Sequence, residues 1–214
     1  MKRPRMTADR MMVLAVAFAA ALGLAGPAAA QPLDEDEGPS LAEPQLVDPQ
    51  PAPDSLVPGL AVTYWLHMVR HVDEIVDWKK YRDGTPGEPL PKLAYRGGLG
   101  EVLTSGYDDG VLAEITGLIR LDKVGSYFIA AETNDGFQLT IGGAVVVNDP
   151  DVHADRFSDP VEMLVTTPGW YELHAYYFER KNTNTLKLHW LEPGSDGGTM
   201  PVVPAEVFAH IPSQ

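Results

Sequence analysis

The sequence predicts an all-β domain, built as an antiparallel β-sandwich or barrel, from three observations. Short apolar segments recur along residues 58–214 and are separated by turns rich in Gly, Pro and Asn. Several of these segments alternate apolar and polar residues with the period of two that is typical of a half-buried strand. Helical periodicity is almost absent from the same region.

The stretch from Gly125 to Asp149 shows this pattern most completely. It contains an aromatic strand, a turn over Thr133-Asn134-Asp135-Gly136 and an alternating strand over residues 137–141. Gly142-Gly143 then predicts a tight hairpin and a return strand. A polar loop follows from Asn148 to His153, so two turns that carry acidic side chains lie close together in the sequence.

Further strands are predicted on both sides of this stretch. They cover residues 59–65, 111–121, 159–165, 170–179 and 185–191, with a closing segment at 202–211. Residues 71–81 fit one or two short helical turns, or a loop packed by its own side chains. Trp170 and Trp190 lie in strands whose pattern predicts interior positions.

The N-terminal 30 residues predict a signal peptide. A basic start precedes an apolar run over residues 11–24, which is short for a membrane span, and Ala28-Ala29-Ala30 suits cleavage before Gln31. The alternative is an uncleaved N-terminal anchor. We expect an exported protein, periplasmic or extracellular, with no stable membrane insertion after cleavage.

Residues 31–57 predict a disordered linker before a single domain over residues 58–214. The linker contains seven acidic residues, six prolines and no basic residue. Proline and like charge favour an extended, solvated chain. The linker is either a spacer that holds the domain off a surface or a leader without a role.

Charge and composition exclude several classes of function. The formal net charge of −14 makes nucleic acid and anionic lipid poor partners. The absence of cysteine excludes a thiol nucleophile, a disulfide framework and a cysteine metal site. The oligomeric state stays open.

Seven ordered segments resemble the PA-14 family, the protective-antigen lectin-like domains. They begin at Gly59 (GLAVTYW), Ile115 (ITGLI, followed by GSYF), Thr133 (TNDGFQLTIGG), Pro168 (PGWYEL), Tyr176 (YYFE), Leu186 (LKLHW) and Val203 (VPAEVF). The resemblance covers nearly all of residues 58–211. It implies a β-sandwich that acts as a carbohydrate-binding or adhesive module.

The resemblance also implies a site. In the lectin members, two adjacent aspartates at the signature turn hold Ca²⁺, which coordinates sugar hydroxyls. Asn134 and Asp135 occupy these positions, so an amide replaces the first acid and removes one negative charge. Asp149 and Asp151 add oxygen ligands in the next loop, which completes the candidate calcium set. Two outcomes stay open: calcium at these residues, or no cofactor.

The candidate ligand-binding residues combine these turns with two aromatic side chains. They are Asn134, Asp135, Asn148, Asp149, His153, Trp78 and Tyr81. Trp78 and Tyr81 lie in a less regular segment, where we expect exposed rings that stack on sugars. The competing interpretation of Asp135 is structural: its carboxylate accepts backbone N–H bonds within its own turn.

No enzyme motif is present. The sequence lacks a G-x-S-x-G elbow, an H-E-x-x-H pair and a phosphate-binding glycine loop, and no pattern selects the two carboxylates that a glycosidase needs. The sequence therefore predicts a non-catalytic module whose partner is a carbohydrate or glycoconjugate. The alternatives are a structural or protein-interaction domain without a small ligand and, less favoured, an unrecognised glycoside-acting enzyme.

Overall fold

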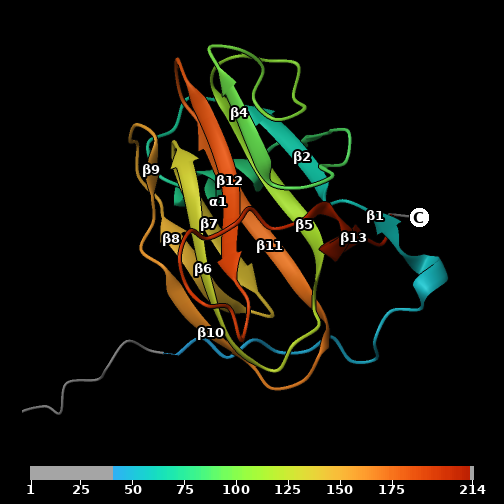
Figure 1. The fold of residues 1–214 in the computed structure, drawn as a ribbon. Coiled ribbons are helices and arrows are strands. Elements are labelled where there is room, and N and C mark those ends of the chain that lie inside the picture. The colour runs from blue at the N-terminus through green and yellow to red at the C-terminus, as the bar shows by residue number, and fades with distance from the viewer. Residues whose placement is uncertain (1–40, 213–214) are drawn as a thin grey trace, which may run out of the picture. The chain divides into compact units, whose positions relative to one another are not determined.

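The computed structural model describes residues 41–212 and confirms the predicted all-β sandwich. Two antiparallel sheets pack against each other, and short helices are attached to them (Figure 1). The predicted signal peptide, residues 1–30, lies outside the described residues. None of the described helices is both long enough and apolar enough to cross a bilayer.

The larger sheet has eight strands. They are β1 (Val57–Pro58), β2 (Ala61–Leu66), β3 (Thr85–Pro86), β5 (Val111–Leu121), β7 (Phe137–Ile141), β8 (Ala144–Asp149), β11 (Gly169–Glu179) and β13 (Phe208–His210). The central pair is β5 and β11, which are in register from Val111↔Glu179 to Leu121↔Gly169. Strands β2 and β13 lie end to end along the other edge of β5.

The smaller sheet has five strands. They are β4 (Ala94–Gly98), β6 (Gly125–Asn134), β9 (Arg156–Phe157), β10 (Val161–Val165) and β12 (Asn184–Leu191). Strand β6 pairs with β12 on one side, and with β10 and β9 one after the other on the opposite side.

The core lies between the sheets and is formed by the residues that the alternation selects. Along β5 the inward side chains are Val111, Ala113, Ile115, Ile119 and Leu121, all buried as predicted. The same holds for the apolar positions of β7 and for Leu186, Leu188 and Trp190 on β12. Burial of these side chains is the main source of stability in such a sandwich.

The interior position predicted for Trp170 is wrong. Trp190 is buried, but Trp170 is only partly buried, and the guanidinium of Arg120 lies 5.7 Å from its ring. Its neighbour Tyr171 faces the core instead. Because successive side chains of a strand point to opposite faces, Trp170 must lie on the outer face of β11.

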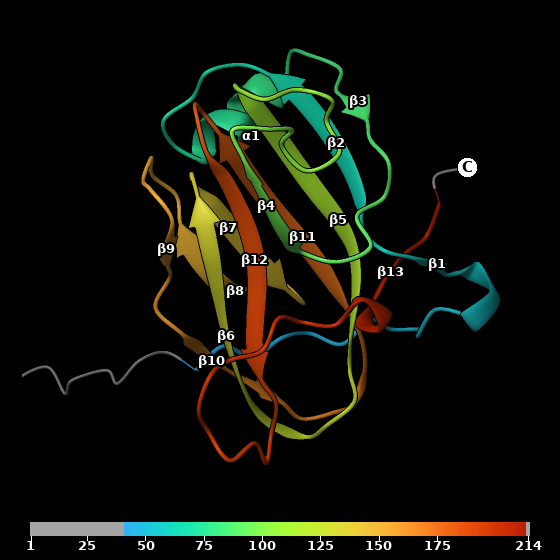
Figure 2. The ribbon, with the colours of Figure 1, turned by 45° about the horizontal axis from the view of Figure 1, so that its top comes forward.

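Helix α1 (Asp73–Lys79) covers part of the outer face of the larger sheet (Figure 2). A second, smaller core forms there, because outward side chains of three neighbouring strands meet apolar residues of α1 and the segment before it. It contains Trp65, Val69, Val72, Ile75, Leu112 and Phe178. On the same face, the Glu114 carboxylate accepts hydrogen bonds from Lys79 of α1 and from Tyr176, and it contacts Nε2 of His174.

The predicted disorder of the linker does not hold for residues 41–57. This segment, here called the strap, crosses the end of the sandwich and ends in the 3-10 helix η1 (Pro53–Ser55) and β1 (Figure 1). Ala42 bridges Met163 and Leu46 bridges Tyr171, and both apolar side chains pack on the core. Prolines at sheet edges cost no ladder hydrogen bond, so a proline-rich segment can still bind an edge.

A second 3-10 helix, η2 (Ala205–Val207), leads into β13, which is the last of the described strands. Val203 and Val207 on either side of its start are buried in the main core. The predicted closing segment therefore packs as part of the domain.

Candidate functional site

Three loops meet at one end of the sandwich, opposite the strap. They are the β6–β7 turn at residues 134–136, the β8–β9 loop at 150–155 and the β11–β12 loop at 180–183. The loops meet because of how the strands pair: β12 pairs with β6, which places Thr185 opposite Asn134, and β11 pairs with β7, which places Tyr177 opposite Phe137. The two acid-bearing turns of the sequence are therefore neighbours in space, and we call this end the rim.

Asp135 links all three loops. Its Oδ1 accepts a hydrogen bond from the backbone N–H of His153 at 3.0 Å, and its Oδ2 accepts one from the N–H of Arg180 at 2.9 Å. The side chain is buried, and this burial raises the pKa of its carboxyl even though both hydrogen bonds oppose the rise. The carboxylate thus accepts backbone N–H bonds, but from two other loops rather than from its own turn.

Asn134 is held by its amide and by its carbonyl. Nδ2 donates to Oδ1 of Asp155 at 3.0 Å and to the Thr183 hydroxyl at 2.9 Å, while the backbone carbonyl accepts the Tyr177 hydroxyl at 2.6 Å. The peptide bond between Asn134 and Asp135 is cis. Both amide protons of Asn134 are used, so its Oδ1 is the atom left to accept a further bond.

Asp155 completes this network, and its surroundings have opposing effects on the pKa of its carboxyl. Burial alone would raise its pKa, but the hydrogen bond from Asn134 and the ion pair with Arg96 lower the pKa overall. An ionised Asp155 therefore fixes the orientation of the Asn134 amide. Asp155 was not predicted as a site residue, because its role depends on a contact with Asn134, which lies 21 positions earlier in the chain.

Asp149 is bound within the β8–β9 region. Both of its oxygens face the Arg156 guanidinium, and Nε2 of His153 lies 3.1 Å from Oδ2. The His153 ring is buried, and its Nδ1 lies 2.9 Å from the carbonyl of Ala154. His153 therefore joins Asp149 to Asp135, since its ring contacts one acid and its backbone N–H binds the other.

The rim encloses a depression of about 310 Å³, which we call the rim pocket. Its lining comprises residues 134–135, 152–154 and 180–183. Three of the predicted ligand-binding residues, Asn134, Asp135 and His153, are thus brought together. Loop 180–183 was not predicted as part of the site, and the only signal in the sequence was its run of polar residues after a strand.

The remaining loop candidates lie outside the rim pocket. Asn148 is exposed and its Oδ1 accepts a hydrogen bond from Gln138, while Asp149 faces Arg156. Both line a separate depression beside β9. Asp151 is exposed, and its backbone bridges His71 at the start of the α1 segment.

The residues that the resemblance assigns to calcium form a poor ligand set. Ca²⁺ takes six to eight oxygens and favours carboxylates. The rim pocket offers the single carboxylate of Asp135, and the basic residues Arg180 and Lys181 line the same depression. Within residues 41–212, no three His, Cys, Asp or Glu side chains are placed to hold a metal ion.

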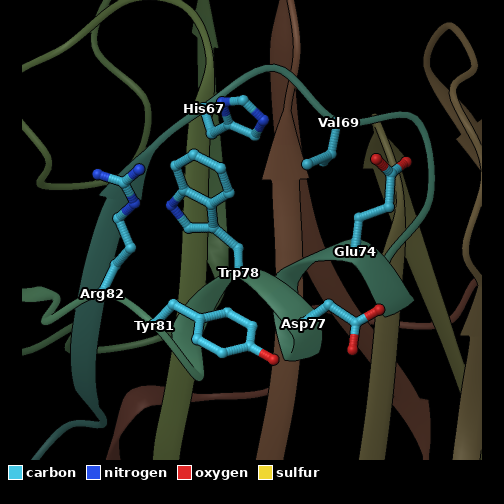
Figure 3. Close-up of a pocket in the computed structure, with 7 residues that line it drawn as sticks. All are labelled: His67, Val69, Glu74, Asp77, Trp78, Tyr81 and Arg82. Carbon is cyan, nitrogen blue, oxygen red and sulfur yellow. The ribbon is translucent and has the colours of Figure 1, made fainter.

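Trp78 and Tyr81 lie apart from the rim pocket, at the end of α1. They line a depression of about 410 Å³ together with His67, Arg82 and two acidic residues of the helix (Figure 3). Trp78 is partly buried, whereas Tyr81 is 85% exposed. The predicted exposure of this aromatic pair is thus found mainly at Tyr81.

Solved structures with this fold include PA14 domains. The PA14 domain of MpAFP antifreeze protein is 14% identical over 77% of this chain and 96% of its own, with a TM-score of 0.62. The PA14 sugar-binding domain from an RTX adhesin is 16% identical over 72% and 99%, with a TM-score of 0.56. The fold of the chain is therefore that of PA14 domains, as the resemblance implied.

A third similar structure contains a bound sugar. The A domain of epithelial adhesin 9 from Candida glabrata, in complex with Galβ1-4GlcNAc, is 10% identical over 80% of this chain and 97% of its own, with a TM-score of 0.61.

No family model matches the chain, and no curated protein is similar to it in sequence.

Proposed function

We propose that this domain is an exported, non-catalytic carbohydrate-binding module that serves adhesion. The observation that carries the proposal is the rim pocket, where three loops place fixed polar groups around a shallow depression. Shallow polar sites of this kind bind by hydrogen bonds to hydroxyl groups, and rigid positioning lowers the entropy cost of binding. Two structures of similar fold support the same interpretation, since one is the PA14 sugar-binding domain of an RTX adhesin and the other is the adhesin 9 A domain in complex with a disaccharide.

The module binds its sugar without calcium. Asn134 Oδ1 is an available acceptor, and the side chains of Arg180, Lys181 and Asn182 supply donors around the same depression. These groups can contact sugar hydroxyls directly. The lone carboxylate of Asp135 instead orders the loops, because it bonds to two of them.

Export and the absence of catalysis rest on different grounds. Export follows from the predicted signal peptide, and N-terminal sequencing of the mature protein should begin at Gln31. The non-catalytic assignment is supported by the rim itself, where Asp135 and Asp149 are both bound by fixed donors of the chain. A glycosidase keeps one carboxyl available as an acid and the other as a base or nucleophile.

Binding of the purified domain to a printed array of mono- and oligosaccharides, with calcium or with EDTA, tests the proposal. We expect the same glycans to be bound in both conditions. Asn182→Gly should weaken the interaction about tenfold, which corresponds to about 1.4 kcal/mol. Asn182 has a φ of 78°, so glycine keeps the loop conformation and removes only the amide side chain.

The matched control is Asn148→Ala, which removes an exposed amide outside the rim pocket and should leave binding unchanged. Loss of all binding in EDTA would overturn the calcium-independent mechanism. Absence of binding to every glycan in both conditions would overturn the lectin function and favour a structural or protein-interaction domain.

A further inference from the structure

Two depressions adjoin on the side of the domain that carries α1. The first, of about 410 Å³, is lined by Trp78, Tyr81 and Arg82 among others, and the second, of about 340 Å³, by Trp78, Arg82 and Tyr107. Because both contain Trp78 and Arg82, they lie on two sides of one pair of side chains. We call the two adjoining depressions the groove, and each of them contains an exposed tyrosine.

Stacked side chains form the middle of the groove. The Trp78 indole stacks on the His67 ring with centroids 3.7 Å apart and planes 7° from parallel, and the Arg82 guanidinium carbon lies 4.7 Å from the Trp78 ring (Figure 3). The backbone carbonyl of Arg82 accepts a hydrogen bond from the buried Trp65 indole. Stacking on His67 therefore orients the Trp78 ring, and the hydrogen bond from Trp65 holds the backbone of Arg82.

The two tyrosines are held through their backbones, which hydrogen-bond to Ser105, Val102 and Trp78, whereas their rings project to the surface. Tyr81 is 85% exposed and Tyr107 is 51% exposed, and neither hydroxyl makes a hydrogen bond within residues 41–212. Their rings are available to contact a ligand.

Charged and hydroxyl groups are interspersed with the apolar side chains that line both depressions. Asp77 and Arg82 line one half, and Asp83 and Ser105 line the other. Protein–protein interfaces are enriched in Tyr, Trp and Arg but depleted of Asp, Glu and Ser, whereas both depressions contain acidic residues and the second also contains serine. Aromatic faces separated by charged and hydroxyl groups suit a chain of sugars instead, because each pyranose has an apolar C–H face and a rim of hydroxyl groups.

We infer that this groove is a second, metal-free carbohydrate site that binds an oligosaccharide chain, with Tyr81 and Tyr107 as stacking faces. The inference rests on the proposed carbohydrate-binding function and adds to it the class of ligand, a chain rather than a single sugar. The groove and the rim pocket belong to adjoining parts of the fold, since the N–H of Val72 donates to the carbonyl of Pro150 at 3.0 Å.

Titration calorimetry in EDTA tests the groove with the oligosaccharide that the array ranks first, and with its terminal monosaccharide. We expect Tyr81→Ala and Tyr107→Ala each to weaken oligosaccharide binding about tenfold, while monosaccharide binding at the rim pocket is unchanged. Tyr81→Phe should bind like the wild type, because stacking needs the ring and not the hydroxyl. Both tyrosines are exposed, so the folded state should tolerate these variants.

Phe128→Ala is the matched control, because Phe128 is an exposed aromatic residue on β6 of the other sheet. If both tyrosine variants bind the oligosaccharide as the wild type does, the groove is not a sugar site, although the rim pocket can still be one. If instead the tyrosine variants lose binding of a proline-rich peptide but not of glycans, the groove is a peptide site and the inference is wrong. If no glycan binds the wild type, both proposals fail together.

Discussion

Glu179 is a buried carboxyl group whose replacement should change how stability depends on pH. It is the last residue of β11, its side chain is fully buried, and neither oxygen has a hydrogen-bond partner among the described residues. Burial, reinforced by the negative charges of Asp109 and Asp135, raises its pKa from the ordinary value of 4.5 to about 8. The folded domain therefore favours the protonated form of the Glu179 carboxyl.

The direction of the effect follows from proton linkage. In the unfolded chain this carboxyl loses its proton near pH 4.5, whereas in the folded domain it keeps the proton up to about pH 8. Across that window the folded state binds more protons, so the free energy of unfolding falls as the pH rises. A difference of about 3.5 pH units at 1.36 kcal/mol each corresponds to on the order of 3–5 kcal/mol.

Urea unfolding of the wild type and of Glu179→Gln, measured between pH 5 and pH 8.5, tests this expectation. Glutamine resembles the protonated acid in shape and cannot ionise, so the variant should not show this decline. Relative to the wild type, its free energy of unfolding should therefore increase with pH by about 3 kcal/mol or more. Titrations elsewhere in the domain cancel in the difference between the two proteins.

Glu172→Gln provides the matched control, since Glu172 lies on the same strand but is exposed. Its curve should run parallel to that of the wild type. If the curve of Glu179→Gln is also parallel to that of the wild type, then burial does not raise the pKa of Glu179 in the folded domain, which refutes the prediction.

Two further changes test other parts of the fold. The hydrogen bond to His174, followed by the contact with Lys79, lowers the pKa of the Glu114 carboxyl to about 2 although burial opposes the change. Glu114→Gln should therefore lower the free energy of unfolding by up to about 3 kcal/mol near pH 7. This loss should vanish as the pH falls from 4.5 towards 2, where the wild-type carboxyl is protonated as well. An equal loss at pH 2.5 would contradict the prediction. Gln50→Ala removes the hydrogen bonds between the strap and the backbone N–H and carbonyl of Trp170. It should lower the free energy of unfolding by about 1–2 kcal/mol and speed hydrogen exchange at the Trp170 amide. Unchanged exchange would show that Gln50 does not hold the strap there.

The class of fold could be predicted from the sequence because alternation is a local property. The inward positions of β5, β7 and β12 follow from a period of two that each segment shows by itself. Trp170 shows the limit of this reasoning, because its aromatic character suggested burial while its register places it outside. The strap shows another limit, since composition describes a chain's average tendency and not the sheet edge that it meets.

The sequence by itself determined the sandwich and the polar character of the turns, because backbone propensity and side-chain periodicity act between near neighbours. Only the tertiary structure decided which turns meet. It brought Asp135 to the N–H groups of His153 and Arg180, turned Asp149 towards Arg156, and left Tyr81 uncovered beside Trp78. These contacts join residues far apart in the chain, and their geometry exists only after the two sheets have packed.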